Sequence, residues 1–230
     1  MRIEDLNWMD VEKYLQKEDR IMAVLGACEQ HAYLSLMTDM IIPLALADAA
    51  SRTTGVVVAP SLNFGVSPYF MEYPGTISLR TETFLNVVED ILRSLYDHGF
   101  RRILFLNGHG GNDLARGRLV EVSNQLPGLK LAWYAWWVSH SVEQVAMKHE
   151  LKPTHASWLE AFEFTKVHEL PEEQKLPPSF QGLLNAKETR AVYKDGSFGG
   201  PYQVDNGIMD ELFDAALQDV LLLLEFTNYS

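Results

Sequence analysis

The sequence predicts an α/β fold built around a mostly parallel sheet, and three observations support this prediction. Short, wholly apolar runs of strand length recur along the chain, and helical patterns separate these runs. Side chains of the types that commonly bind metals follow two of the runs. A strand that is apolar on both faces is typical of a parallel sheet covered by helices on both sides. The 230 residues suffice for one such domain, and we expect a single domain over residues 1–230.

The first half of the chain alternates predicted helices and strands. Asn7 is placed to cap a short helix whose apolar side, including Trp8, packs on the core. We predict a strand where a short run is wholly apolar and a helix where apolar residues recur every three or four positions. In order, the predicted elements are this helix over 6–16, a strand over 21–27, a helix over 39–51 and a strand over 55–60. Strand, helix and strand make a βαβ unit.

The middle of the chain continues this alternation. Residues 61–79 form a long connection rich in Gly, Pro, Tyr and Phe, and such a connection is more often functional than a simple linker. The helix over 81–98 is strongly indicated, because its apolar residues keep helical spacing and a glycine follows it. The elements that follow are a strand over 102–106, a helical pattern to about residue 125 and a strand over 129–137.

The pattern weakens beyond residue 138, where polar segments and prolines dominate. We make no prediction of topology for this part. Residues 188–193 are expected to be irregular. Residues 210–224 have a strong apolar face and are predicted to form the closing helix.

Charge and composition exclude several classes of partner. The chain carries 19 Lys and Arg against 31 Asp and Glu, and its net charge of −12 disfavours binding to nucleic acid or to an anionic membrane surface. A single cysteine cannot form an internal disulfide, and residues 1–10 lack the basic-then-apolar order of a secretory signal. The apolar runs are shorter than the roughly 18 residues that span a bilayer. We therefore expect a cytoplasmic protein without a nucleic-acid or membrane partner.

Three side chains of the type that binds metals lie close together after the first predicted strand. Glu29 and His31 are two residues apart, and side chains at that spacing project to the same side of an extended chain. Asp39 begins the next helix, where negative charge is favoured. Each has a simpler interpretation, because Asp39 alone would be a helix cap and His31 a hydrogen-bonded core histidine. The neighbouring Cys28 is more often a small buried hydrophobe than a nucleophile.

A glycine-rich turn, Asn107-Gly-His-Gly-Gly-Asn112, follows the third predicted strand. Ligands of open α/β sheets collect at the carboxyl ends of the strands, and glycines there let the backbone approach a ligand closely. His109 therefore stands where a ligand site is expected. A phosphate site is the alternative, but the spacing fits neither the dinucleotide fingerprint nor the P-loop.

A third candidate pair, His155 and Glu160, offers a base and a carboxylate. The alternative is that Ser157 and Glu160 form a capping box that opens a helix containing Phe162 and Phe164. The number and placement of the candidates in all three segments favour a metal site. A mixed set of histidines and carboxylates suits Zn²⁺, Mn²⁺ or Fe²⁺ rather than Ca²⁺ or Mg²⁺.

Four motifs, in this order, resemble those of the creatininase (creatinine amidohydrolase) family. They are Glu29-Gln-His31 followed by Leu-x-Thr-Asp39, Tyr-Pro-Gly-Thr-Ile-Ser-Leu at 73–79, Asn-Gly-His-Gly-Gly-Asn at 107–112, and His155-Ala-x-x-x-Glu160. Together they cover the chain from near residue 8 to the glycine-rich stretch 196–200. The resemblance implies a three-layer αβα sandwich with a mostly parallel central sheet, a two-metal centre, and a homo-oligomer, commonly a hexamer.

The resemblance also implies the ligands and the reaction. By motif matching, Glu29, Asp39 and His109 hold one metal ion, and His31, Asp39 and Glu160 hold the other. Zinc is the expected metal, with manganese or iron as alternatives. The implied reaction is hydrolysis of a C–N amide bond, in which a water shared by the two ions attacks while one ion polarises the carbonyl.

The expected catalytic residues are Glu160 and His155, which matches the family's proton-shuttling histidine. Backbone N–H groups around Gly110 and Gly111 are placed to hold the developing oxyanion. The expected partner is a small-molecule amide, which includes cyclic amides. Formamide deformylation, peptide trimming and a non-catalytic metal- or ligand-binding scaffold are the alternatives.

Departures from the family pattern concern the pocket rather than the ligands. The first loop is one residue shorter over 32–35 than in most members, Phe70 stands where many carry a histidine, and Gly111 stands where creatininase has a glutamate. These changes predict a more apolar pocket. The aromatic residues expected to contact the substrate are Tyr33, Tyr69, Phe70 and Trp158.

Overall fold

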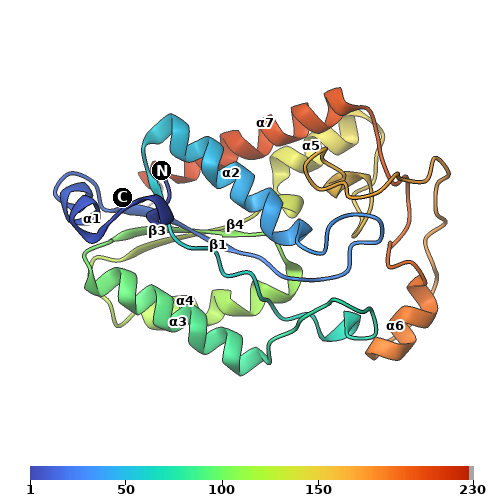
Figure 1. Cartoon of the computed structure of the whole chain (residues 1–230), viewed down its shortest axis with the longest axis horizontal. Coiled ribbons are helices and arrows are strands. Elements are labelled where there is room, and N and C mark those ends of the chain that lie inside the picture. Colours follow the sequence, from blue (N-terminus) through green and yellow to red (C-terminus); the bar gives the residue numbers. More distant parts are fainter. Residues whose placement is uncertain (228–230) are drawn as a thin grey trace.

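The computed structural model describes residues 1–227. Its strands are β1 (Arg20–Leu25), β2 (Val57–Val58), β3 (Arg102–Asn107) and β4 (Lys130–Ala135). Its α-helices are α1 (Trp8–Leu15), α2 (Thr38–Thr54), α3 (Thr81–Asp97), α4 (Ala115–Ser123), α5 (His140–Lys148), α6 (Ala186–Tyr193) and α7 (Asn206–Leu223). The elements form three layers, with α2, α5 and α7 on one face of the sheet and α3 and α4 on the other (Figure 1). The predicted α/β fold is confirmed.

The four strands are parallel, in the order β2-β1-β3-β4. β1 and β3 pair along their whole length, from Arg20 opposite Arg102 to Leu25 opposite Asn107. Asn107 in turn lies opposite Ala135 of β4. Because the strands run the same way, the segments that follow them leave the sheet at one edge, which is where ligands bind in sheets of this kind.

After Arg20, β1 is apolar at every position because both of its faces are buried. Met22 and Val24 belong to the core beneath α2, α5 and α7. Ile21, Ala23 and Leu25 belong to the core on the α3 side. A strand buried on both faces gains from apolar residues at every position, which explains why the run shows no alternation.

The first half of the chain follows the prediction with two differences. β2 pairs over only two residues, and the chain leaves the sheet before Pro60, which has no N–H to donate to a neighbouring strand. Trp8 does not pack on the core, since it is 71% exposed. Val11 and Leu15 of the same helix do contact the core. Asn7 caps α1 as predicted, by accepting from two backbone N–H groups.

The second half contains the larger corrections. The expectation that 188–193 is irregular is wrong, because α6 forms there and is stabilised by a capping box between Asn185 and Glu188. The helix considered after Ser157 is also wrong, since the chain makes only the short 3₁₀ turn Trp158–Glu160. α5 was not predicted, whereas the closing helix α7 is confirmed.

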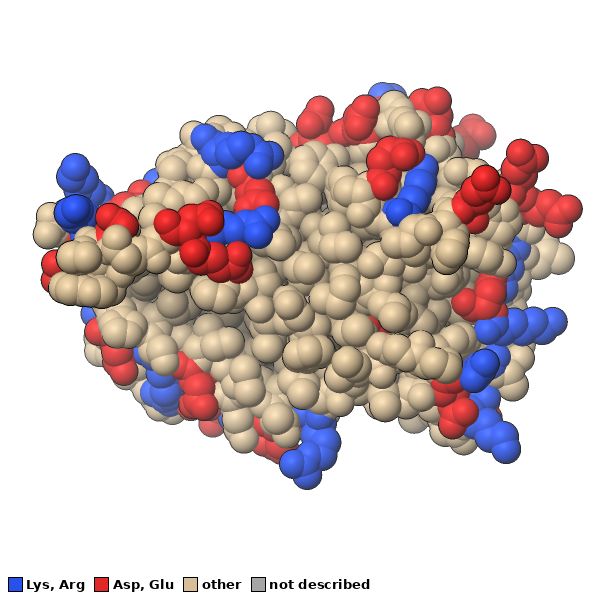
Figure 2. Space-filling model, viewed as in Figure 1, with Lys and Arg blue, Asp and Glu red and all other residues tan. Residues whose placement is uncertain are grey.

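On the face drawn in Figure 2, acidic side chains predominate along the upper right edge. Lysines and arginines on this face lie among aspartates and glutamates near the periphery, and the middle of this face is largely free of charged side chains (Figure 2). Within residues 1–227, the helices are all too short or too polar to cross a membrane.

Candidate metal centre

The start of α2 lies directly against the carboxyl ends of β1 and β3. Two glycines make this approach possible. A Cβ atom on Gly108 would stand 1.8 Å from the carbonyl oxygen of Asp39, and one on Gly26 would stand 2.7 Å from the Cα of Met40. Any larger residue at either position would push the helix away from the strands. The glycines therefore bring Asp39, in the first turn of α2, to the edge of the sheet.

Asp39 lies between two histidines that come from different loops. Its Oδ1 atom is 2.9 Å from Nε2 of His31, which follows β1. Its Oδ2 atom is 2.8 Å from Nδ1 of His109, which follows β3. All three side chains are buried. The carboxylate of Asp39 is thus shared by two imidazoles, one on each oxygen.

Two sets of potential metal ligands meet at Asp39. One consists of Glu29, Asp39 and His109, and the other of His31, Asp39 and Glu160; within each set the ligand atoms lie within 4.8 Å of one another. The structure therefore brings together all the side chains that the motifs suggested as ligands, in the same two groups. A third set, which overlaps both, contains His155 in addition to Glu29 and His31.

The donor atoms of these residues fit divalent cations. Glu29 Oε2, His31 Nε2 and Asp39 Oδ2 are buried and have no hydrogen-bond partner of good geometry. Buried polar atoms without partners cost free energy, and a bound cation would remove that cost. The imidazole and carboxylate donors suit zinc, manganese or iron.

The second nitrogen of each histidine is held by the backbone. Nδ1 of His31 donates to the carbonyl oxygen of Glu29 over 3.1 Å. Nε2 of His109 donates to the carbonyl oxygen of Val66 over 2.9 Å. These contacts fix the tautomer and the ring orientation, so that the remaining nitrogen of each ring faces Asp39, as is usual for histidines that bind metals.

The backbone conformation at Ala156 orients the side chain of Glu160. Ala156 adopts the left-handed region with φ 52°, which is uncommon for a residue other than glycine. In this conformation its N–H donates to Oε2 of Glu160 over 2.6 Å. The alternative that Glu160 belongs to a capping box fails, because Ser157 makes no side-chain cap hydrogen bond. Glu160 instead turns back toward the histidines.

The carboxylates and histidines shift one another's pKa strongly. Burial raises the pKa of Glu29 to about 7, and the neighbouring Asp39 adds to this rise. Burial disfavours the charged form of His109, but the carboxylates of Glu29 and Asp39 outweigh it and raise its pKa to about 9. His31 is likewise raised well above its ordinary pKa, by Asp39 and Glu160 against the effect of burial. Burial would raise the pKa of Asp39, but the two histidines hold it well below its usual range.

Metal binding is therefore expected to release protons and to depend on pH. A ligand must be deprotonated to bind a cation, and at pH 7 His109 is mostly protonated in the metal-free protein. Affinity should rise by about tenfold per pH unit for each proton released between pH 7 and 9, and then level off. Titration calorimetry with zinc in buffers of different ionisation enthalpy should show at least one proton released per chain at pH 7. Uptake of metal without proton release would contradict this description of the site.

His155 stands beside the ligands in an aromatic setting. Its ring lies 4.9 Å from the stacked ring of Phe70 and 4.8 Å from that of Phe198, measured between centroids. Burial, and then the positive charge of His31, lower its pKa to about 4. Its Nε2 atom is 3.8 Å from Oε1 of Glu29. His155 is therefore a neutral imidazole at pH 7, close to the ligand cluster.

Gln30 sets which nitrogen of His155 carries the hydrogen. The amide oxygen of Gln30 accepts from the N–H of Ala32, and its amide nitrogen donates to the carbonyl oxygen of Gly196. These two bonds fix the orientation of the amide group. The same nitrogen lies 3.0 Å from Nε2 of His155, which must then accept. The lone pair of His155 is thus on Nε2, the nitrogen nearest Glu29.

A cavity of about 860 Å³ opens beside the cluster. Phe70, Gly110 and Gly111 line it as expected, together with Tyr69. A Cβ atom on Gly111 would stand 1.9 Å from the carbonyl oxygen of Val66, so no side chain fits there without movement of the backbone.

Two expected substrate contacts lie elsewhere. Tyr33 lines a second, smaller cavity, where its ring meets the edge of Tyr202. Trp158 is fully buried in the core, and its indole N–H donates to the carbonyl oxygen of Lys152. Neither is among the residues that line the cavity beside the ligands. Tyr33 lies in the loop after β1, and Trp158 begins the 3₁₀ turn Trp158–Glu160 with its side chain in the core.

Several residues of the site were not predicted as functional. Gln30 was visible in the first motif, but its role depends on a contact with the distant His155. Trp137 ends the strand predicted over 129–137 but was not expected at the site, and Phe198 lines the cavity from a segment whose placement no local pattern indicated. Cys28 behaves as a small buried residue, as expected, since its Sγ donates to the carbonyl oxygen of Gly75.

Comparisons with known proteins give one family. The family model described as Creatininase, creatinine amidohydrolase, matches residues 4–224. Creatinine amidohydrolase of Pseudomonas putida is 30% identical over 119 residues, which are 49% of this chain and 46% of that protein. The 3-dehydro-scyllo-inosose hydrolase of Thermotoga maritima is 26% identical over 109 residues, or 46% and 35% of the two chains. The mycofactocin precursor peptide peptidase of Mycolicibacterium smegmatis is 34% identical over 99 residues, or 40% of each.

The aligned region thus spans less than half of each of these curated relatives. Solved structures match over almost the whole chain. A manganese form of creatininase superposes with a TM-score of 0.77 at 20% identity, covering 96% of this chain and 95% of that one. A creatininase mutant complexed with creatine gives a TM-score of 0.81 at 19% identity, with the same coverage. At this level of identity, these matches show a shared fold.

Proposed function

The chain belongs to the creatininase family, and we propose that it is a hydrolase that cleaves a C–N amide bond of a small molecule with two divalent metal ions. One observation carries the proposal. Asp39 is buried between two sets of histidine and carboxylate ligands that share it. Three buried donor atoms of this cluster make no well-formed hydrogen bond, although two of them each lie close to another side chain of the cluster, and this favours a cation in each set. The relatives support the reaction class, since each is named for a hydrolytic activity.

The metal ions would supply the activation: bound divalent cations lower the pKa of water and polarise a carbonyl oxygen. The protein positions the other participants. Asp39 holds the two ligand sets together, and the backbone N–H groups at Gly110 and Gly111 line the cavity beside them, where they would donate to a developing oxyanion.

We assign proton transfer to His155. Its low pKa keeps the ring neutral at pH 7, and the contact with Gln30 leaves the lone pair on Nε2. This atom would accept a proton from the attacking water and pass it to the departing nitrogen. Phe70 and Phe198 flank the ring and would limit the access of bulk water to it. The homo-oligomer and the cytoplasmic location stay predictions.

A substrate screen tests this proposal. Protein purified without chelator and loaded with zinc or manganese would be incubated with cyclic amides, N-formyl compounds and short peptides. We expect metal-dependent release of product from at least one class, and its loss in Glu160→Ala. The matched control is Glu163→Ala, because Glu163 is exposed and pairs with Lys166 at the surface. Product release that survives Glu160→Ala or removal of metal would contradict the mechanism, and no turnover of any class would favour a non-catalytic scaffold.

A further inference from the structure

We propose that the substrate of this site is an amide whose non-reacting part is uncharged and aromatic or bulky aliphatic, rather than a compound carrying a carboxylate or phosphate. The inference rests on the proposed hydrolase function, since it concerns the cavity beside the same ligands. The side chains that line this cavity in the described part of the chain are largely apolar, several of them are exposed, and none of them is a lysine or arginine.

Large apolar side chains from separate segments line the cavity. Tyr69 comes from the connection after β2, Leu114 from the turn before α4, Val138 from the turn after β4, and Phe198 from the segment after α6. Three of these are unusually exposed for their size: Tyr69 by 48%, Leu114 by 54% and Val138 by 67%. A group of exposed apolar side chains around a cavity is typical of a surface that a ligand covers.

Trp137 places an aromatic surface beside the reacting group. A Cβ atom on Gly110 would stand 3.9 Å from the Cζ2 atom of Trp137, which is ordinary van der Waals contact. The indole therefore lies next to the N–H groups proposed to hold the oxyanion. The part of the substrate adjacent to the amide would pack on this ring. The cavity of about 860 Å³ leaves room for more than one ring.

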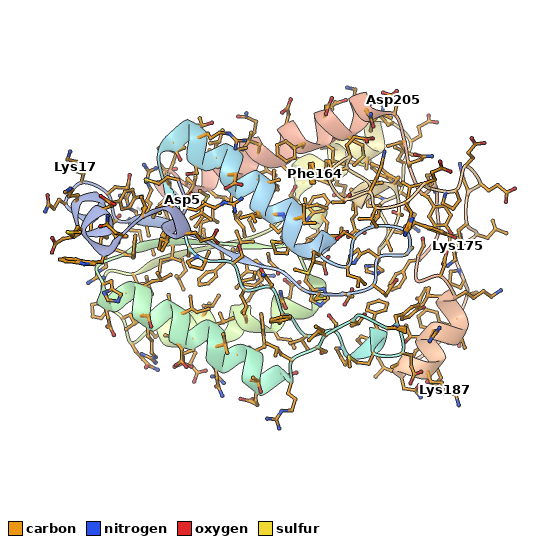
Figure 3. The ribbon with its side chains drawn as sticks, in the orientation of Figure 1. Asp5, Lys17, Phe164, Lys175, Lys187 and Asp205 are labelled. Carbon is orange, nitrogen blue, oxygen red and sulfur yellow. The ribbon has the colours of Figure 1, made fainter. Side chains whose placement is uncertain are left out.

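The charges around the cavity argue against an anionic substrate. Among the described residues that line it, no lysine or arginine is present, and the carboxylates are those of Glu29, Asp39, Glu160 and Asp113. Sites for carboxylates and phosphates commonly use arginine or lysine. Asp113, in the 3₁₀ turn after β3, adds a further negative charge to the lining. The lysines labelled in Figure 3 (Lys17, Lys175 and Lys187) lie toward the two ends of the molecule.

Binding of simple hydroxamates tests this inference without the need for turnover. A hydroxamate chelates the metal ions and directs its tail into the cavity. Calorimetry on the zinc-loaded protein would compare acetohydroxamate, phenylacetohydroxamate and 4-carboxyphenylacetohydroxamate. We expect the phenyl compound to bind about 10- to 100-fold more tightly than the methyl compound, because the ring leaves water. The carboxylated compound should lose most of this gain.

Two variants and a control sharpen the test. Trp137→Ala should reduce the advantage of the phenyl tail over the methyl tail about tenfold. Leu114→Arg, at a position that is 54% exposed, should improve binding of the carboxylated compound about fivefold. Trp8→Ala removes an exposed tryptophan on α1, far from the cavity, and should change nothing.

The possible failures are distinguishable. Equal binding of the methyl and phenyl compounds, or tighter binding of the carboxylated one, would overturn the inference and leave the proposed hydrolase intact. No binding of any hydroxamate to protein with full metal content would overturn the proposed centre and the inference together.

Discussion

Asp39→Asn is expected to remove both metal ions and to reduce hydrolysis on the order of 10³-fold, the effect of several kcal/mol of lost transition-state stabilisation. The amide keeps the shape of the side chain but not its charge. Asp39 contacts both His31 and His109, so one substitution disturbs both ligand sets. Metal analysis by mass spectrometry and a hydrolysis assay would be applied to the purified variant.

The control for this substitution lies on the same helix. Asp48 of α2 forms a partly buried ion pair with Arg2 through two contacts and belongs to neither ligand set. Asp48→Asn should therefore keep its metal content and activity. If Asp39→Asn retains one ion per chain with its full affinity, Asp39 is not shared and the two-set description is wrong.

His155→Ala is expected to keep its metal content, unlike Asp39→Asn. Its turnover should fall by about 10²- to 10⁴-fold, which is typical for a lost general acid or base. The reason is that the lone pair of His155 lies on Nε2, the nitrogen nearest Glu29, where it accepts from Gln30. This lone pair would be available to the attacking water once that contact is exchanged, and the low pKa of His155 keeps the ring neutral. Loss should appear in kcat more than in KM, because the imidazole acts on protons rather than on substrate binding.

A surface histidine serves as the control. His149 pairs with Glu211 on α7, away from the cavity, and His149→Ala should behave as the unsubstituted protein. If His155→Ala loses one metal equivalent, the third set of potential ligands, with Glu29 and His31, would be the true one. His155 would then be a ligand and not a proton carrier.

Most of the ligand candidates could be predicted from the sequence because they follow strands that are easily recognised. β1 is apolar from Ile21 to Leu25 and β3 from Ile103 to Leu106. Parallel strands end at one edge, so His31 and His109 were expected to meet. The first turn of α2 was equally clear. These are short-range patterns, each read from about ten residues.

The substrate cavity could not be predicted in the same way. Part of its lining comes from the segment between α6 and α7, which contains Phe198, and local sequence patterns did not predict where this segment lies. The position of Trp158 was mistaken because Ala156 adopts a left-handed conformation that sequence patterns do not indicate for alanine. That same turn aims Glu160 at the histidines. The left-handed conformation of Ala156 therefore both made this turn difficult to predict and brings Glu160 to the other ligand candidates.

The number of metal ions bound per chain tests the central claim most directly. Protein purified without chelator, loaded with zinc, freed of unbound metal by gel filtration and analysed by inductively coupled plasma mass spectrometry, should contain about two equivalents per chain, one for each ligand set around Asp39. Fewer than one equivalent in folded protein would contradict the two-metal centre and the hydrolytic mechanism that depends on it.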